Sequence, residues 1–410
     1  MTWIRNVRVA DVRSPFYGEV VDLHIAEGRI AAVEPASDDV DGPAVDAADM
    51  WVFPAMVDVM ARWGEPASDA AESIESGLRA AMQGGFSRVF LSPLSYPFYH
   101  DGAAIEALLS RTASAPIFVH PIGSASAHLD TWQLGPIGEM VEAGAAAVAV
   151  ACGSVSARHI QSLMEYMQRW EVPLIVSPRP GPEMLVWEGP TAVRMGLPGI
   201  RPEAEREWAA TLRNLSRRTE VDVLFYPFSD PEAVLMSEDH FHPATDGFHL
   251  VWNDEKLLTW DARFKFSPPL HFHAGKDRPE ILDHMAFIAS GHHPVLQHHK
   301  ENDFLTAAPG AIGHATLLPL LQSAFETRDF HQKILPLLTH RPRELMGLPA
   351  VVVEEGAPAE LVLYHPDETW TLDASTNASR STNSPLWGRT LTGRVRRLIT
   401  PQGTFNVTDL

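Results

Sequence analysis

Hydrophobic and polar residues alternate along the first part of the chain with the period of two that is typical of β-strands. The apolar positions include Trp3, Val7 and Val9, and they continue through 20–25 and 30–33. Turn-forming residues separate these runs, such as Ser14-Pro15 before the second run. Short strands joined by turns at this spacing predict a small β-sandwich.

From residue 51 the pattern changes to an alternation of short apolar strands and amphipathic helices. The predicted strands are 52–59, 87–91, 116–120, 146–151, 174–176 and 221–226, with weaker candidates at 249–252 and 287–289. The predicted helices are 70–83, 103–110, 137–143, 159–169, 203–219, 316–326 and 330–338. About eight strand–helix units in this rhythm predict an α/β protein with a (β/α)8 TIM-type barrel.

The end of the chain returns to a strand pattern, at 359–364, 369–372 and 393–399. We therefore predict a composite β-sandwich domain built from residues 1–50 and 350–410. Residues 51–349 form the predicted barrel domain.

Composition narrows the functional classes. The formal net charge of −20 disfavours binding to nucleic acid or to anionic membranes, and no apolar run reaches the roughly 20 residues that span a bilayer. The first residues enter a strand pattern without the layout of a signal peptide. A single cysteine, Cys152, excludes an internal disulfide and fits a reducing cytoplasm, so we expect a cytoplasmic protein.

Several segments, in the same order along the chain, resemble the dihydroorotase family of the amidohydrolase superfamily. In that family the first barrel strand ends in Pro-Gly-Leu-Ile-Asp-x-His-x-His. The resembling segments here are 53–66, 71–86, 196–205, 265–270, 304–313 and 383–395. Lys265-Phe266-Ser267-Pro268-Pro269-Leu270, for example, is similar to the family's Lys-Val-Asn-Pro-Pro-Leu. The resemblance implies the amidohydrolase barrel with its β-sandwich.

The residues that bind catalytic zinc in the family are replaced in this chain. The resemblance aligns the two metal-binding histidines of the first strand with Met60 and Arg62, and the later metal positions with Ser177, Pro227 and Gly291. The fourth-strand segment 148–153 contains no lysine or carboxylate for the bridging position. A thioether is a poor zinc ligand and a guanidinium is none, so we expect no metal cofactor.

The positions that hold the substrate in the family are replaced as well. They align with Gly64, Leu94, Ser267 and His271. Glycine and leucine cannot build the bidentate clamp that a substrate carboxylate requires.

Other residues suggest alternative sites. Histidines at 271, 273, 292, 293, 298 and 299 form a relocated metal site or, more simply, exposed loop histidines. Cys152 ends a predicted strand and is a nucleophile or a buried apolar residue. Arg62 and Arg179 bind an anion or pair with Glu65. We interpret 237–243 as a loop that is mobile or faces a partner.

The resemblance implies a non-catalytic dihydroorotase-like subunit, because such members associate with the aspartate transcarbamoylase catalytic chain in pyrimidine biosynthesis. A homo-oligomer or hetero-oligomer follows from that role. One alternative is an active, metal-dependent cyclic amidohydrolase of the dihydroorotase or hydantoinase kind with an altered site. Another is a small-molecule binder that uses the vacated pocket.

Overall fold

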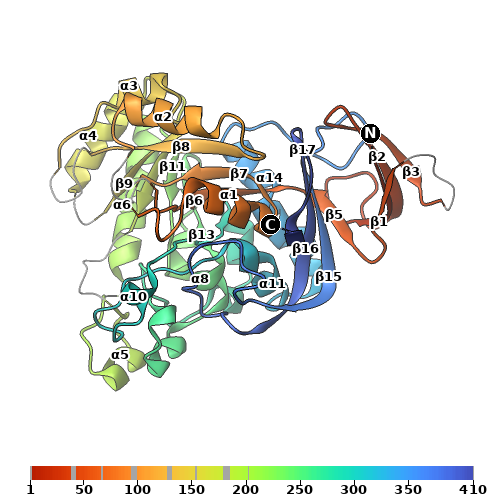
Figure 1. Ribbon diagram of the computed structural model, residues 1–410. Coiled ribbons are helices and arrows are strands. Elements are labelled where there is room, and N and C mark those ends of the chain that lie inside the picture. The colour runs from red at the N-terminus through yellow and green to blue at the C-terminus, as the bar shows by residue number, and fades with distance from the viewer. Residues whose placement is uncertain are drawn as a thin grey trace.

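A computed structural model describes residues 2–37, 43–65, 68–93, 99–126, 132–152, 155–178, 185–201 and 203–409. A barrel of strands and helices forms the larger part, and a sheet that contains the first strands of the chain projects from one side of it (Figure 1). In the described part of the chain, no helix combines the length and hydrophobicity needed to cross a lipid bilayer.

The barrel is built on parallel strands. Seven of them pair in one sheet: β6 (Met56–Ala61), β7 (Phe86–Leu91), β8 (Phe118–Ser124), β9 (Ala147–Ala151), β10 (Leu174–Ser177), β11 (Val223–Phe225) and β12 (Phe241–Pro243). After Ala244 the chain continues as β13 (Thr245–Asp246), which pairs in parallel with β14 (Ile288–Ala289). Because β14 also contacts β6, the sheet closes on itself. The predicted barrel fold is confirmed.

Alternate residues of the strands fill the barrel interior, as the period of two requires. The interior cluster is formed by Val57, Val59, Met60, Phe90, Ile122, Ala147, Ala149, Ile175, Leu224, Tyr226, Ala244, Phe287 and Ala289. The intervening residues, such as Val148 and Val176, pack outward against the helices.

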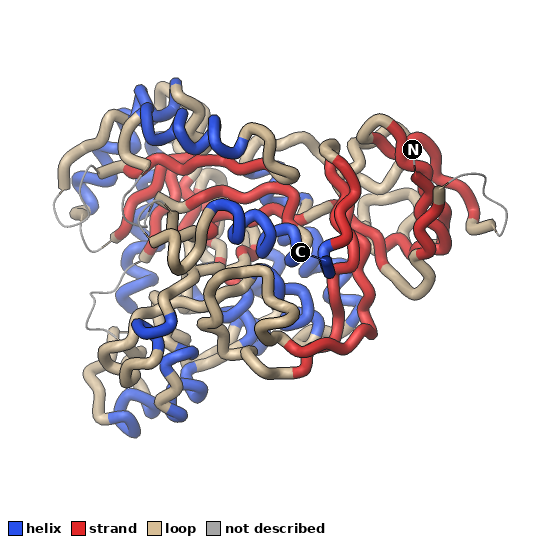
Figure 2. The backbone as a smooth tube through the Cα atoms, in the orientation of Figure 1, coloured by secondary structure: helices blue, strands red, loops and turns tan. Residues whose placement is uncertain are grey.

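Helices cover the outside of the barrel (Figure 2). The α-helices are α1 (Ile74–Gly84), α2 (Gly102–Thr112), α3 (Ile137–Glu142), α4 (Ala157–Met167), α5 (Pro190–Met195), α6 (Glu203–Thr219), α7 (Pro231–Val234), α8 (Gly247–Val251), α9 (Ile281–His284), α10 (Gln297–Lys300), α11 (Leu317–Gln322), α12 (Thr327–Asp329), α13 (Leu335–Leu338) and α14 (His340–Leu345). The 3₁₀-helices are Asp254–Thr259, Ala262–Phe264, Gly275–Asp277, His314–Thr316 and Val407–Asp409, and Phe330–Ile334 is a π-helix. Helix α1 begins with a capping box between Ser73 and Ser76 and ends at Gly85, whose φ of +88° suits a glycine.

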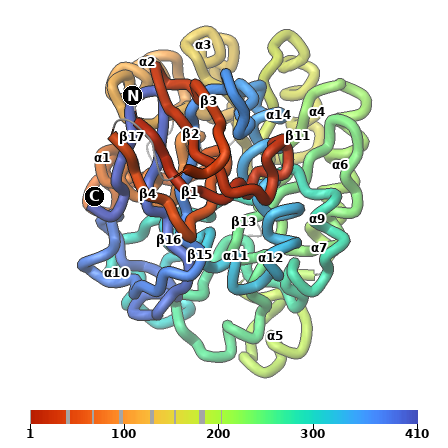
Figure 3. Tube along the Cα trace, turned by 90° about the vertical axis from the view of Figure 1, so that its right-hand side faces the viewer, coloured from red at the N-terminus to blue at the C-terminus, as the bar shows by residue number. Residues whose placement is uncertain are grey.

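The second sheet joins both ends of the chain. Its strands are β1 (Thr2–Val9), β2 (Val20–Ala26), β3 (Arg29–Pro35), β4 (Ala44–Asp46), β5 (Trp51–Pro54), β15 (Leu361–Thr371), β16 (Thr390–Thr400) and β17 (Gly403–Asn406). The order is β17-β16-β15-β5-β1-β2-β3, with β4 paired to β1. Figure 3 shows β1–β4 lying in front of the barrel. Residues from both ends, such as Val7, Leu23 and Leu361, pack in one core, as the β-sandwich prediction requires.

The strand predicted over 52–59 is two strands that belong to different sheets. Strand β5 pairs with β1 and β15, and β6 begins the barrel directly after Ala55. This short connection fastens the β-sandwich to the barrel. The domain boundaries at 50 and 350 stay a prediction.

Two predictions around the seventh barrel strand are wrong. Residues 249–252 were expected to be a strand, but Gly247–Val251 is helix α8, because the Asp246 carboxylate accepts N–H bonds from Phe248 and His249 and caps it. The seventh strand is β12 with β13, so the end of the presumed loop 237–243 is buried strand. The weak strand candidate at 287–289 is confirmed as β14.

Candidate functional site

A small cavity lies where the barrel strands end, which is the end where barrel active sites are found. Its volume is about 40 Å³. It is lined by Met60, Arg62, Ser177, Tyr226, Pro227, Asp246, His249, Phe266, Ser267, Gly291, His292, His293 and Gly310. The structure therefore brings together the metal-aligned positions Met60, Arg62, Ser177, Pro227 and Gly291.

The substrate-aligned positions are scattered. Ser267 lines the cavity, whereas Gly64 and His271 do not. A Cβ atom on Gly64 would lie 2.0 Å from the Ser68 carbonyl oxygen, so this backbone leaves no room for a side chain there. His271 is buried, its ring lies edge-on to Trp187, and burial lowers its pKa to about 3. Leu94 and Arg179 lie outside the described residues.

Met60 lines the cavity and packs into the barrel interior. Its side chain is 4% exposed and belongs to the barrel's interior cluster. The pairing of β6 with β7 shifts register between Val59 and Ala61, and Met60 at this bulge has a φ of +75°. A left-handed conformation is unusual for a side chain of this size, so the bulge re-aims the residue at the cost of local strain.

Arg62 is held at the cavity by the end of the eighth strand. Its backbone N–H donates to the His292 carbonyl at 3.0 Å, and its Nη1 lies 3.4 Å from Nδ1 of His293. The residue places a guanidinium among the cavity walls, where the charge stays at every physiological pH.

Sequence reasoning missed the pair Asp246 and His249. Nδ1 of His249 lies 2.9 Å from the Asp246 carboxylate, and Nε2 lies 2.9 Å from the Pro268 carbonyl oxygen. Two acceptors require two N–H donors, so the ring is an imidazolium. Burial disfavours this charge, but the Asp246 carboxylate and the bond to Pro268 outweigh it and raise the pKa of His249.

Asp246 also limits the space for a side chain at position 291. The φ of Gly291 is +65°, and a Cβ atom built on it would lie 2.9 Å from Cγ and 3.1 Å from Oδ2 of Asp246. A carboxylate at position 291 would therefore meet a second carboxylate in a backbone conformation that favours glycine. In this structure Asp246 occupies the space that a side chain at position 291 would need.

Comparison with known proteins identifies the family of this chain. The chain is 31% identical over 409 residues to a dihydroorotase of Solibacter usitatus (strain Ellin6076), with 95% of this chain and 94% of that one covered. The chain belongs to the dihydroorotase family. It is also 29% identical over 409 residues to a dihydroorotase-like protein of Pseudomonas aeruginosa, with 96% of each covered. No family model matches.

Solved structures of hydantoinases share the fold. An L-hydantoinase from Arthrobacter aurescens superposes with a TM-score of 0.83 at 17% identity, over 99% of this chain and 96% of that one. A D-hydantoinase from Thermus sp. gives 0.80 at 14% identity, over 98% and 95%. These neighbours support the barrel and β-sandwich architecture.

The zinc that the family resemblance implies does not fit the cavity residues that the structure describes. Among the described residues, no group of three or more His, Cys, Asp or Glu side chains could hold a metal ion. Asp246 and His249 bind each other, and each imidazole nitrogen of His249 already faces an acceptor. Zinc requires about four donors with available lone pairs.

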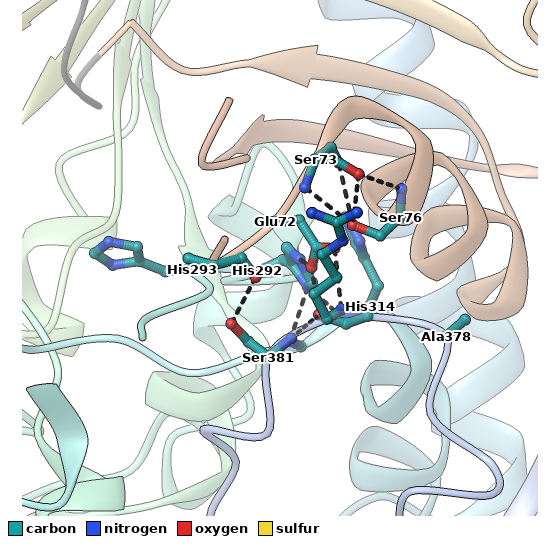
Figure 4. A network of polar contacts seen from close by, with 12 residues as sticks. Glu72, Ser73, Ser76, His292, His293, His314, Ala378 and Ser381 are labelled. Carbon is teal, nitrogen blue, oxygen red and sulfur yellow. Dashed lines mark hydrogen bonds and ion pairs between the residues drawn. The ribbon is translucent and has the colours of Figure 1, made fainter. Parts of the chain in front are cut away.

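His292 is also engaged by its surroundings (Figure 4). Its Nδ1 accepts N–H bonds from Gly313 and His314, and its Nε2 lies 3.4 Å from the Glu72 carboxylate. Its ring stacks on His314 at 3.9 Å, and His314 lies 2.8 Å from Asp58. Burial lowers the pKa of His314 to about 4. In Figure 4 the His293 ring points away from this cluster.

The remaining sequence candidates lie apart from the cavity. Cys152 is 2% exposed in the layer between strands and helices, and burial raises the pKa of its thiol. His298 and His299 are exposed on α10. Glu65 pairs with Arg111 and accepts an N–H bond from Ile74. None of these four residues lines the cavity.

Proposed function

We propose that this member of the dihydroorotase family is a non-catalytic subunit that assembles with the catalytic chain of aspartate transcarbamoylase. One observation carries the first half of the proposal. All five metal-aligned positions surround one cavity, and they supply a thioether, a guanidinium, a hydroxyl, a proline ring and a glycine. None of these groups is a carboxylate or an imidazole, so these five positions offer no good ligand for a zinc ion that would activate water.

The size of the cavity supports the same conclusion. Sites for small organic ligands usually enclose about 300–1,000 Å³. The cavity here, at about 40 Å³, is far smaller than that. The resemblance assigns a substrate-binding arginine to position 64. The backbone around Gly64 leaves no room for that side chain.

The assembly half of the proposal rests on family resemblance. Members of the family that lack catalytic residues hold aspartate transcarbamoylase in larger complexes, and this chain keeps the family's fold along its whole length. The net charge of −20 favours a partner with a basic contact surface.

An active cyclic amidohydrolase is the second candidate. It is favoured by the relatives named dihydroorotase, one of them 31% identical over nearly the full chain. Sequence likeness alone does not choose between the candidates, because a relative named dihydroorotase-like protein is 29% identical over a similar length.

Metal analysis and hydrolysis assays separate the two. We expect the purified protein to contain well below one equivalent of zinc, manganese or iron by plasma mass spectrometry. We also expect no hydrolysis of dihydroorotate or hydantoin above buffer, with or without added zinc. One or two tightly bound equivalents together with turnover would establish the active enzyme instead.

The proposed assembly is tested by mixing the two purified proteins. The protein and the aspartate transcarbamoylase catalytic chain of the same organism should co-sediment at low salt in analytical ultracentrifugation. If both species sediment independently, the assembly role is wrong, whereas the metal result still decides whether the chain is catalytic.

A further inference from the structure

We propose that a groove between the β-sandwich and the barrel binds a free α-amino acid with an apolar side chain. The groove is lined by the sheet strands β1, β2, β5 and β15 and by the barrel helices α11 and α12, on the side of the molecule seen in Figure 3. None of its lining residues belongs to the cavity at the barrel mouth. A ligand here goes beyond the proposed function, and its binding can be measured without a metal or a partner protein.

The groove has the size of a ligand site. Its volume is about 540 Å³, whereas the cavity at the barrel mouth holds about 40 Å³. Sites for small organic molecules usually enclose about 300–1,000 Å³. The groove therefore has room for an amino acid together with some of its hydration water.

Strand pairing places an aromatic wall beside a cation. Arg8 of β1 is paired with Val20 of β2 on one side and with Trp51 of β5 on the other. Paired residues of neighbouring strands point to the same face of a sheet, so these three side chains lie next to one another. The Trp51 indole is held in place by the His331 ring, edge-on at 4.4 Å, and by the Tyr364 ring at 5.8 Å. This row supplies apolar surface and one positive charge.

Arg8 has donors available for a ligand. Its Nη1 donates to the Gly18 carbonyl oxygen at 2.8 Å. Within the described ranges, the Arg8 side chain makes no other hydrogen bond and no ion pair. A guanidinium carries five N–H groups, and two parallel ones can bind a carboxylate. The remaining donors of Arg8 can therefore bind the carboxylate of an amino acid.

The groove also contains two carboxylates without a cation. Asp49, just before β5, and Asp367, on β15, both line it. Among the residues that the structure describes, neither carboxylate accepts a hydrogen bond or joins an ion pair, not even with Arg8. The backbone N–H of Arg8 donates to the Met50 carbonyl at 3.0 Å, so Asp49 follows directly along the groove. These carboxylates can accept hydrogen bonds from an ammonium group.

The combination of groups selects the class of ligand. A ligand with only negative charge would meet Asp49 and Asp367, and one with only positive charge would meet Arg8. A free α-amino acid carries one charge of each sign. Its apolar side chain can cover the exposed parts of Trp51 and Val20, which removes apolar surface from water. The three features of the groove are thus used by one small molecule.

The experiment compares three matched ligands on the full chain. L-leucine carries both charges, L-leucinamide lacks the carboxylate, and N-acetyl-L-leucine lacks the ammonium group. Each is titrated by isothermal calorimetry at low ionic strength, and saturation-transfer NMR follows the bound ligand. The binding energy per atom of small ligands sets the expected Kd for L-leucine at roughly 1 mM. Each analogue should bind at least about tenfold more weakly, because it loses one charge-assisted contact.

Three variants locate the two charges of the ligand. Arg8→Gln should weaken L-leucine binding about tenfold and leave L-leucinamide binding unchanged. Asp49→Asn combined with Asp367→Asn should weaken L-leucine binding about tenfold and leave N-acetyl-L-leucine binding no weaker. Asparagine suits position 49, because it tolerates the φ of +64° found there. Arg29→Gln is the matched control and should bind unchanged, because Arg29 also donates from Nη1 to a carbonyl oxygen, that of Gly356, but lies outside the groove.

Three outcomes would overturn the proposal. The first is the absence of saturable L-leucine binding up to about twenty times the expected Kd. The second is binding at the natural strength in Arg8→Gln protein whose circular dichroism shows that it is folded. The third is L-leucinamide or N-acetyl-L-leucine binding as tightly as L-leucine, since the groove would then recognise a single charge.

Discussion

A buried cluster of charges joins the β-sandwich to the barrel. Glu360, just before β15, lies 2.7 Å from Nη2 of Arg88 on β7 and 2.9 Å from Nη2 of Arg343 on α14. Ser87 donates a further hydrogen bond to the same carboxylate. All three charged side chains are less than a tenth exposed, so water contributes little to their solvation.

Replacing Glu360 with glutamine should destabilise the protein strongly. The amide keeps the shape of the side chain, but it removes the negative charge that two buried guanidinium groups share. Removing one partner of a buried ion pair typically costs about 3–5 kcal/mol, because the remaining charge is left uncompensated. With two arginines on one carboxylate, we expect the upper part of that range.

Urea unfolding followed by tryptophan fluorescence measures this effect at pH 7.5. The control is Glu344→Gln, which removes the same charge from an ion pair with Arg13 whose side chains are 57% and 43% exposed. An exposed pair contributes at most about 1 kcal/mol. If the Glu360→Gln midpoint moves no further than that of the control, the reasoning about this buried cluster is refuted.

The pH dependence of the free energy of unfolding provides a second test of the same cluster. Burial raises the pKa of Glu360, but the hydrogen bond from Arg88 and the charges of Arg343 and Arg88 outweigh it, so the pKa lies below its ordinary value. The stabilisation is thus present above the unfolded pKa of about 4.3 and is lost as the pH falls through the folded value. Between these values the natural chain should lose stability more steeply than Glu360→Gln.

Three other predictions concern the barrel. Asp246→Asn should destabilise the protein by about 3 kcal/mol at pH 6, and the difference should shrink as the pH rises through the raised pKa of His249, as urea midpoints at several pH values will show. Gly291→Asp should cost about 2–4 kcal/mol and bind no zinc, so a stable, zinc-loaded variant would contradict the described contact with Asp246. Cys152 should react with a thiol reagent at under about a tenth of its rate in urea, and rapid labelling of the native protein would show that the thiol is accessible.

Much of the fold could be predicted because the barrel strands are short apolar runs between amphipathic helices. The strands at 146–151 and 174–176 were predictable for that reason, since β9 and β10 are fully buried. The prediction failed at the seventh strand, where Leu250, Val251 and Trp252 suggested a strand. A short apolar run is compatible with either a strand or a helix. Here the N-cap at Asp246 favours the helix.

The site was predictable only where the family motif gave a position. Met60, Arg62 and Gly291 were found because a known pattern marks their places. Asp246 and His249 were missed because their importance depends on the turn between β13 and α8, which brings two residues three apart into an ion pair. The Asp246-Gly247 sequence was an available signal, since aspartate is a favoured N-cap.

The pairing of β5 with β15 constrains how the protein is made. Leu361 pairs with Pro54 and Tyr364 with Trp51, so the two strands are roughly 310 residues apart in the chain. At a synthesis rate of about 5–20 residues per second, β15 leaves the ribosome about 15–60 s after β5. The last barrel strand, β14, emerges before β15. The nascent β-sandwich therefore waits with an open strand edge at β5 while the barrel is completed, and this interval is when a chaperone or a stray strand would find it.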